Sequence, residues 1–277
     1  MTRGRTRSSD LVTPFHGVRA HRIRHILDAA GAYAAVMPAG RFFSHVTAAR
    51  LHGFRMPEGY REHDLHVTAV APANAPRGRG IAGHQVNERP TLQLIHGLPV
   101  TDPITTWLDC AAVLGVDEHI EMADGLVCRK NPITTVDELQ DAVARSPRRR
   151  GLRSLRTALM DVRAGTDSPR ETQLRLMVVR AGFPEPEVNG EIRNARGEPI
   201  AHGDLVFREY RTIQEYDGRQ HAEDPWQFGI DIRRLDDLME ENWRVIRVDK
   251  DLISHPAILF RKLTAALQSR GWKPKLP

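Results

Sequence analysis

Two carboxylates and a histidine lie close together in the segment IQEYDGRQHAED, residues 213–224. Glu215 and Asp217 are two residues apart, so on an extended strand their side chains point to one face. Gly218 permits a turn, after which His221 comes within reach of the same place. Like charges on one face repel each other, and the repulsion grows as water is excluded. A divalent metal ion would turn this repulsion into attraction, and a solvated turn is the alternative.

Two more carboxylates precede this segment. Asp204 falls in the strand before Glu215, and a tight connection would set the two strands side by side. Glu171 falls in the first turn of the preceding helix, where the positive helix end favours an acid. Three hard oxygen ligands from three elements suit Mg²⁺ or Mn²⁺, which could orient water and polarise a phosphodiester. The structural alternatives are a turn cap for Asp204 and a simple first-turn acid for Glu171.

The order of these acids resembles the PD-(D/E)XK nuclease fold. Asp204 is followed by ten residues and then by Glu215, Tyr216 and Asp217, all after a helix that carries Glu171. Over about residues 166–272 the chain is more closely similar to the branch of very-short-patch-repair endonucleases. Two ordered motifs carry that likeness, E-Y-D-G-x-x-H and D-x-x-R-x-x-x-L followed by W-x-V-x-R-V. The matching residues are Glu215, Tyr216, Asp217, Gly218 and His221, then Asp231, Arg234, Leu238, Trp243, Val245, Arg247 and Val248.

The resemblance implies a metal-binding role for the acids. One or two Mg²⁺ ions would be held by Glu171, Asp204 and Glu215. Asp217 is a further candidate ligand, and a turn residue beside Gly218 is its alternative role. The family motif has a lysine where this chain has Asp217, and no lysine lies between Lys130 and Lys250.

The resemblance also implies roles for a base and a phosphate-binding group. His221 would act as the general base, because its ordinary pKa suits proton uptake at neutral pH. A solvated surface histidine is the alternative. Arg234 would hold a phosphate by a bidentate contact, and its alternative partner is Asp231, three residues earlier on the same helix.

The first half of the chain resembles the AbiEi-type antitoxin region that is often fused ahead of such a domain. The likeness rests on FFSHVTAARLHGF (42–54), HVT (66–68) and GLPVTDPITTWLDCA (97–111). It implies a winged helix followed by a mixed α/β segment. Ser44 as a helix cap and Gly53 as a helix stop are consistent with the second helix of such a module. Similar helix pairs also occur in proteins that do not bind DNA.

Charge is uneven along the chain, whose net charge is +5. Residues 1–165 carry 22 basic against 16 acidic residues, and the rest carry 18 against 19. A basic half next to clustered acids suggests a polyanion such as DNA as the partner. Six arginines lie between residues 145 and 156, among them the candidate DNA-binding residues Arg148, Arg149 and Arg150. The alternative for this segment is a solvated turn. The basic charge has an alternative explanation too, because 35 of the 40 basic residues are arginine, which can reflect genomic base composition.

The sequence lacks the patterns that are typical of several other classes of protein. No apolar run approaches the roughly 20 residues needed to cross a bilayer, and the basic N-terminus lacks the apolar segment of a secretory signal. Cys110 and Cys128 lie far apart without companions at ligand spacing, which fits a reducing cytoplasm. Walker and nucleophile-elbow motifs are absent. His63 and His66 fall on opposite faces of a strand-like segment, which argues against a metal site there.

Hydrophobic periodicity predicts the secondary structure. In the first half, helices are expected over residues 18–37, 44–53, 102–115, 116–127 and 135–146, with one more ending near 163, and strands over 64–72, 80–86 and 91–101. In the second half the expected order is helix, three strands, helix, strand, helix, which is a sheet with helical crossovers.

Together these patterns predict an α/β protein, α+β overall, in three parts. Residues 1–15 are a flexible basic arm, residues 16–165 a winged-helix-like region that binds DNA or a partner protein, and residues 166–277 a restriction-endonuclease-like αβββαβα domain. The predicted function is that of a cytoplasmic Mg²⁺- or Mn²⁺-dependent DNA endonuclease without membrane association. One alternative is a catalytically inactive DNA-binding regulator or antitoxin-type protein, with a toxin or defence protein as partner. Another is a hydrolase that uses Glu215 and Asp217 as an acid and base pair.

Overall fold

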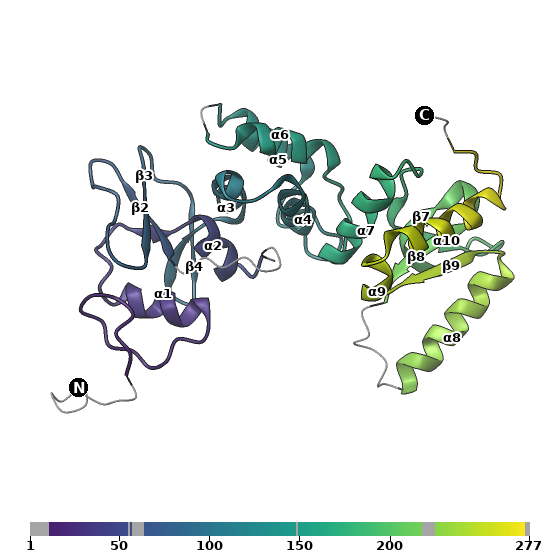
Figure 1. Ribbon diagram of the computed structural model, residues 1–277, viewed down its shortest axis with the longest axis horizontal. Helices are drawn as coiled ribbons and strands as arrows, with labels where there is room; N and C mark the ends of the chain where they lie inside the picture. The colour runs from purple at the N-terminus through teal and green to yellow at the C-terminus, as the bar shows by residue number, and fades with distance from the viewer. Residues whose placement is uncertain (1–10, 55, 57–63, 148, 218–224, 275–277) are drawn as a thin grey trace. The chain divides into compact units, whose positions relative to one another are not determined.

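The fold is taken from a computed structural model, which describes residues 11–54, 56, 64–147, 149–217 and 225–274, apart from the side chains of 225–230. The chain divides into two compact units, whose elements are labelled in Figure 1. Unit 1 comprises Met1–Leu126 and Asp137–Met160, and unit 2 comprises Val127–Val136 and Asp161–Pro277. Each unit combines helices with a mixed sheet, so the predicted α/β class is confirmed.

This division differs from the predicted boundary between residues 165 and 166. It falls between Met160 and Asp161, and Val127–Val136 joins unit 2 although unit 1 flanks it on both sides in the sequence. The arginine-rich segment 145–156 lies inside unit 1 and does not mark a boundary. Composition indicates solvated segments, but contacts between residues distant in sequence decide which core a segment joins.

Unit 1 contains a five-stranded sheet in the order β3-β2-β1-β5-β4. Its strands are β1 (Phe42–Phe43), β2 (Leu65–Val70), β3 (Ile81–Val86), β4 (Leu92–Ile95) and β5 (Leu98–Thr101). The pairs β2–β3 and β1–β5 are parallel, whereas β1–β2 and β4–β5 are antiparallel. Strand β1 was not predicted, because two residues are too few to show a period of two. Strand β2 is interior and almost fully buried.

The prediction of a single strand over residues 91–101 is wrong, because the segment is the hairpin of β4 and β5. His96 and Gly97 form its two-residue turn, with φ of 50° and 79°. Positive φ at both central residues is the geometry of a type I′ turn, whose twist matches that of the flanking strands. Because a histidine is an unusual first residue for such a turn, the sequence signal was weak.

The first helix is shorter than predicted. Helix α1 covers Ile26–Ala34 and does not begin at Val18. The residues before it are held by a bridge between Val12 and Ala20, from which Phe15 and Val18 enter the core. The apolar spacing over this stretch therefore reflects burial of a loop and not helical structure.

The following helices agree with the predictions in kind and place. They are α2 (His45–Leu51), α3 (Pro103–Asp109), the short 3₁₀ helix η2 (Cys110–Ala112), α4 (Val116–Leu126), α5 (Val136–Ala144) and α6 (Leu152–Asp161). Asp102 caps α3 as expected, since its Oδ1 accepts from the backbone N–H groups of Ile104 and Thr105. Ser44 precedes α2 as expected, but its hydroxyl bonds with Thr68 and makes no cap bond.

Unit 2 has the predicted order of helix, three strands, helix, strand and helix. The elements are α7 (Pro169–Arg180), β6 (Glu187–Arg193), β7 (Pro199–Phe207), η3 (Arg208–Tyr210), β8 (Thr212–Tyr216), α8 (Pro225–Glu240), β9 (Arg244–Val248), α9 (Lys250–Ile253) and α10 (Pro256–Gln268). The sheet order is β6-β7-β8-β9. Its first two pairs are antiparallel and β8–β9 is parallel, so α8 is the crossover between parallel strands.

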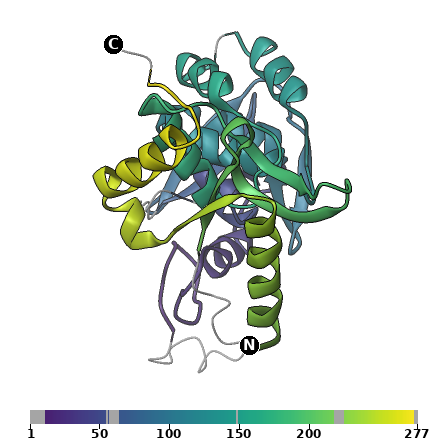
Figure 2. The same cartoon turned by 90° about the vertical axis from the view of Figure 1, so that its right-hand side faces the viewer.

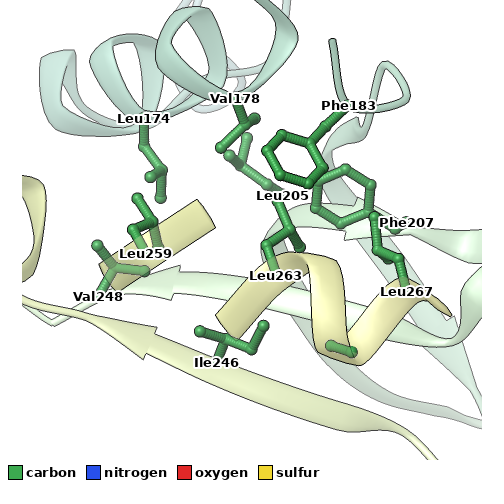
Figure 3. Close-up of a cluster of buried hydrophobic side chains, with 11 residues drawn as sticks. Leu174, Val178, Phe183, Leu205, Phe207, Ile246, Val248, Leu259, Leu263 and Leu267 are labelled. Carbon is green, nitrogen blue, oxygen red and sulfur yellow. The ribbon is translucent and has the colours of Figure 1, made fainter. Parts of the chain in front are cut away.

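Helices cover both faces of this sheet, and Figure 2 shows α8 and α10 on opposite sides of it. On one face, α7 and α10 pack on the strands through the cluster in Figure 3, which includes Leu174, Val178, Leu205, Phe207, Ile246, Val248, Leu259, Leu263 and Leu267. On the other face, Leu238 of α8 packs with Val206 and Ile213. Leu205 and Val206 belong to different clusters because successive side chains of a strand point to opposite faces of the sheet. Leu238 thereby fixes α8, which carries Arg234, against the sheet.

Within the described residues, no helix combines the length and apolar character needed to cross a membrane.

Candidate active site

Asp204 lies where β7 runs beside β8. Leu205 pairs with Gln214, so the preceding Asp204 and the following Glu215 are neighbours across the two strands. The Asp204 carboxylate accepts a hydrogen bond from the backbone N–H of Tyr216 at 2.7 Å. Burial and the negative charges of Glu171 and Glu215 together raise the pKa of Asp204 to about 7, although the hydrogen bond from Tyr216 and the charge of Arg234 oppose the shift.

Glu171 is held in the first turn of α7, as predicted. Its backbone N–H donates to the capping Ser168 Oγ at 3.3 Å, and its side chain is buried. Its Oε2 accepts from the backbone N–H of Asp167 and from Asn189 Nδ2, both at 2.8 Å. Asn189 takes a left-handed conformation (φ 47°) in β6, and its Nδ2 also donates to the Gly165 carbonyl. This amide was not predicted as part of the site, because no spacing rule links it to Glu171.

Glu215 is buried and makes a bidentate ion pair with Arg234 of α8. The two contacts are 2.6 Å to Oε1 and 2.9 Å to Oε2. The hydrogen bonds that Arg234 donates to Glu215 raise the pKa of the Arg234 guanidinium further above its already high value. The direct partner of Arg234 is therefore Glu215 of β8 and not Asp231 on its own helix. The Asp231 carboxylate lies 3.9 Å from Arg247.

Asp217 has a different environment from Glu215. It follows the end of β8, and its backbone N–H donates to the Val248 carbonyl at 2.8 Å. Its half-exposed side chain lies 3.7 Å from Arg247 of β9. The two acids that share a predicted face thus have separate cationic partners, and the ligand role of Asp217 remains a prediction.

Two basic residues from Val127–Val136 also belong to this region, although no sequence pattern indicated them. Arg129 forms an ion pair with Asp167, and Lys130 Nζ lies 3.5 Å from the same carboxylate. The hydrogen bond to Asp167 raises the pKa of Arg129, with a smaller contribution from the charges of Glu171 and Asp204. Backbone bonds from Gly165 to Val127 and from Arg129 to Thr166 hold the segment there.

The remaining predicted site residues are distributed as follows. His221 and Arg148 lie outside the described residues. Arg149 forms an ion pair with Asp109 in unit 1. Arg150 lines a pocket of about 920 Å³ in the same unit.

The acids of unit 2 are close enough to influence one another but are not assembled as a finished metal site. Within the described residues, the one set of three or more histidine, cysteine or carboxylate ligand atoms that all lie within 4.8 Å of one another is that of His45, His66 and His84, in unit 1. A cation bound to Glu171, Asp204 and Glu215 therefore requires their oxygens to move closer together. The ion pair with Arg234 is the contact that Glu215 would have to share or release.

The chain is similar over most of its length to two proteins of Mycobacterium tuberculosis. They are "Uncharacterized protein MT2308" of strain CDC 1551 / Oshkosh and "Uncharacterized protein Rv2248" of strain ATCC 25618 / H37Rv, each 25% identical over 247 residues, with 88% of this chain and 88% of the relative covered. A match of this length includes residues of both units. No family model matches the chain, and no solved structure matches it significantly.

Proposed function

We propose that the protein is a divalent-metal-dependent nuclease whose unit 2 acids cut phosphodiester bonds in DNA. The observation that carries the proposal is the placement of partly buried Asp204 beside buried Glu171 and Glu215, from three different elements. Neighbouring buried carboxylates are unfavourable unless a proton or a cation compensates them. Carboxylate oxygens are the ligands that Mg²⁺ and Mn²⁺ prefer. The resemblance to the PD-(D/E)XK fold supports the same function.

The residues present fit such an ion with one adjustment. Asp204 exchanges its proton near neutral pH, so a cation can displace that proton readily. Glu171 is held on one oxygen by Asp167 and Asn189, which orients its carboxylate. Glu215 would turn one oxygen from Arg234 to the ion. When bound, the ion would polarise the phosphodiester and lower the pKa of an attacking water.

The basic residues around the acids would bind the substrate. Arg234, released from part of its pair with Glu215, would present two N–H groups to a phosphate. Lys130 is 69% exposed and would supply the positive charge that the family motif places at the position of Asp217. His221 stays the proposed general base. These groups would hold the phosphate and the developing negative charge in place.

DNA is the proposed substrate because the first 165 residues are basic and resemble an AbiEi-type antitoxin region. The two cysteines, Cys110 and Cys128, are not joined in a disulfide, which is consistent with the proposed cytoplasmic location.

A second candidate function is that of a DNA-binding regulator without catalysis. It is favoured by the Glu215–Arg234 ion pair, which satisfies the carboxylate without metal, and by the absence of a lysine at the position of Asp217. A regulator of this kind would bind DNA or a toxin-type partner protein in chelator as well as it does in Mg²⁺.

The test is a cleavage assay on the full-length protein. Supercoiled plasmid, linear duplex and single-stranded DNA are incubated with Mg²⁺, Mn²⁺ or chelator, with Asp204→Asn as the site variant. Asp236→Asn, an exposed acid on α8, is the matched control. We expect metal-dependent cleavage that the site variant loses and the control keeps. Cleavage in chelator, or equal cleavage by Asp204→Asn, would contradict the proposal, and DNA binding without any cleavage would establish the regulator.

A further inference from the structure

Three histidines from three elements of unit 1 converge at one place. His66 is in β2, His84 is in β3, and His45 is the first residue of α2. The parallel register sets His84 opposite Thr68, which shares a face of β2 with His66, so the two histidines lie on the same side of the sheet. Sequence reasoning considered only His63 and His66, because the other partners are 21 and 18 residues from His66 and follow no ligand spacing.

The three rings are in mutual contact. His66 Nδ1 lies 2.9 Å from His84 Nε2, and the His45 and His84 rings stack with centroids 3.7 Å apart. One ligand nitrogen from each residue lies within 4.8 Å of the other two. His66 is buried, and His45 and His84 are partly buried. Three imidazoles gathered in this way are a set of nitrogen ligands from separate elements.

His45 is positioned by a network and not by helix geometry alone. Its φ of 50° lies in the left-handed region, which is uncommon for a residue with a side chain. Its Nδ1 lies 2.9 Å from Ser44 Oγ, which is 2.6 Å from Thr68 Oγ1. The backbone N–H of His45 bonds to Asp109, which is ion-paired with Arg149. The surrounding structure thus holds a strained backbone that directs this ring toward His84.

We propose that His45, His66 and His84 bind one divalent transition-metal ion of the zinc class. Imidazole nitrogens select zinc, cobalt, nickel or copper over magnesium and calcium. Zinc–nitrogen bonds of 2.0–2.1 Å set ligand nitrogens about 3.4 Å apart in a tetrahedron. The ligand nitrogens already lie within 4.8 Å of one another, and the stacked rings must turn out of their nearly parallel arrangement to direct these nitrogens at one ion. This site is distinct in ligand chemistry and in unit from the acidic site of the proposed nuclease.

The fourth coordination position would be open to a ligand. Three protein ligands with one open position are typical of catalytic zinc sites, whereas structural sites are closed by four. The pocket of about 920 Å³ is lined by His45, His84, Asp109, Arg145, Arg149 and Arg150. Arg145, Arg149 and Arg150 outnumber the two acids of this lining, Glu88 and Asp109, which favours an anionic ligand at the open position, so inorganic phosphate is the probe for it.

The experiment measures metal binding by the full-length protein after chelator treatment and dialysis. Zn²⁺ affinity is determined by competition with a chromophoric chelator, and Co²⁺ is added to read coordination from its visible absorption. His84→Gln and His45→Gln are the site variants, and His255→Gln, an exposed histidine of unit 2, is the matched control. Asp204→Asn reports any binding at the acidic site. Circular dichroism and thermal unfolding establish that each variant is folded.

We expect one equivalent of Zn²⁺ per chain and a tetrahedral Co²⁺ spectrum that phosphate alters. Changes in residues that only support a metal ligand lower metal affinity roughly 10- to 100-fold. Because His45 and His84 are proposed as ligands themselves, each site variant should lower the Zn²⁺ affinity by more than this. His255→Gln should bind as wild type does. Absence of stoichiometric binding, or equal binding by folded site variants, would show the cluster to be a metal-free histidine stack and overturn the proposal. Loss of Zn²⁺ in Asp204→Asn alone would place the metal in unit 2 and overturn it as well.

Discussion

Asp204 is partly buried next to other acids, so its charged form is unfavourable until a cation is bound. Its pKa in the folded chain is about 7, against an ordinary value of 3.8. Between these two pH values the folded chain holds a proton that the unfolded chain has released. The free energy of unfolding that Asp204 contributes is therefore fully present below pH 3.8 and is lost as the pH rises toward 7.

Asp204→Asn removes this titration. In metal-free buffer we expect the variant to unfold at a higher temperature than wild type at pH 8, by at least about 2 °C, and to differ little from it at pH 4. Mg²⁺ should raise the unfolding temperature of wild type at pH 8 and leave that of the variant nearly unchanged. Thermal unfolding followed by circular dichroism measures both effects. Parallel pH profiles for the two proteins would contradict the burial of a charged Asp204.

At the residue scale, the sequence could identify acids but not their partners. Glu171, Asp204 and Glu215 were named from order and element position, and the structure brings them into mutual influence. Arg129 and Asn189 could not be named, because tertiary packing alone brings them to Glu171 and Asp167. The pairing of Asp217 with Arg247 was likewise invisible, since the period of two no longer applies once β8 has ended.

At the element scale, the segment Val127–Val136 matters because backbone bonds hold it against residues 165–167. It brings Lys130 to the acidic site from a part of the sequence that is remote from the nuclease motifs. Helix α8 positions a site residue in a similar way, because its Leu238 packs on the sheet and so fixes the direction of Arg234. Lys130 on this segment and Arg234 on α8 should therefore affect the proposed cleavage reaction although neither belongs to the hydrophobic core.

Lys130→Ala tests the contribution of that segment. If Lys130 supplies the charge missing from the motif, the cleavage rate at saturating DNA should fall by about tenfold or more. Lys262→Ala, an exposed lysine on α10, is the control and should cleave at the wild-type rate. Unfolding temperatures of all three proteins should agree within about 2 °C, because the Lys130 side chain is exposed. A rate equal to wild type would remove Lys130 from the proposed machinery.

Gly83 in β3 offers a second prediction at this scale. A Cβ there would lie 1.7 Å from the Pro76 carbonyl oxygen, so either β3 or the preceding turn must move. Gly83→Ala should lower the free energy of unfolding by about 1–3 kcal/mol and weaken Zn²⁺ binding, since the next residue is His84. Gly31→Ala in α1, where nothing lies within 4 Å, should raise stability by about 0.5–1 kcal/mol. Denaturant titration distinguishes the two, and equal stability of the two variants would contradict the close approach.

For the whole molecule, the α/β class and the element order of unit 2 could be predicted from the sequence. Long periodic helices such as α7 and α8 carry strong signals, and capping residues such as Ser168 mark where they begin. The division into units could not be predicted, because it depends on contacts between residues far apart in the sequence. Neither could the histidine cluster, in which His66 and His84 meet through the parallel register of β2 and β3 and His45 joins them from α2.

The charge of the molecule leads to a prediction about DNA. Arg150 is exposed on unit 1, and Arg150→Glu should weaken binding of a DNA duplex in metal-free buffer. The slope of log affinity against log salt should become shallower by about 1. Arg261→Glu, at an exposed arginine of unit 2, is the matched charge reversal and should have the smaller effect if unit 1 binds the DNA. Fluorescence anisotropy at several salt concentrations measures the slopes, and unchanged binding by Arg150→Glu would count against DNA contact at this position.

The chain enters unit 2 at Val127, returns to unit 1 at Asp137 and leaves it again after Met160. A recombinant fragment cut at the motif boundary, residues 166–277, would therefore lack the loop that carries Arg129 and Lys130. Transplanting the nuclease-like half onto another protein by a single junction would leave the same gap. Inactivity of such a fragment would report the missing loop and not the chemistry of the acids. The smallest fragment of this chain that keeps the acidic site whole is thus longer than the segment that carries the recognisable motifs.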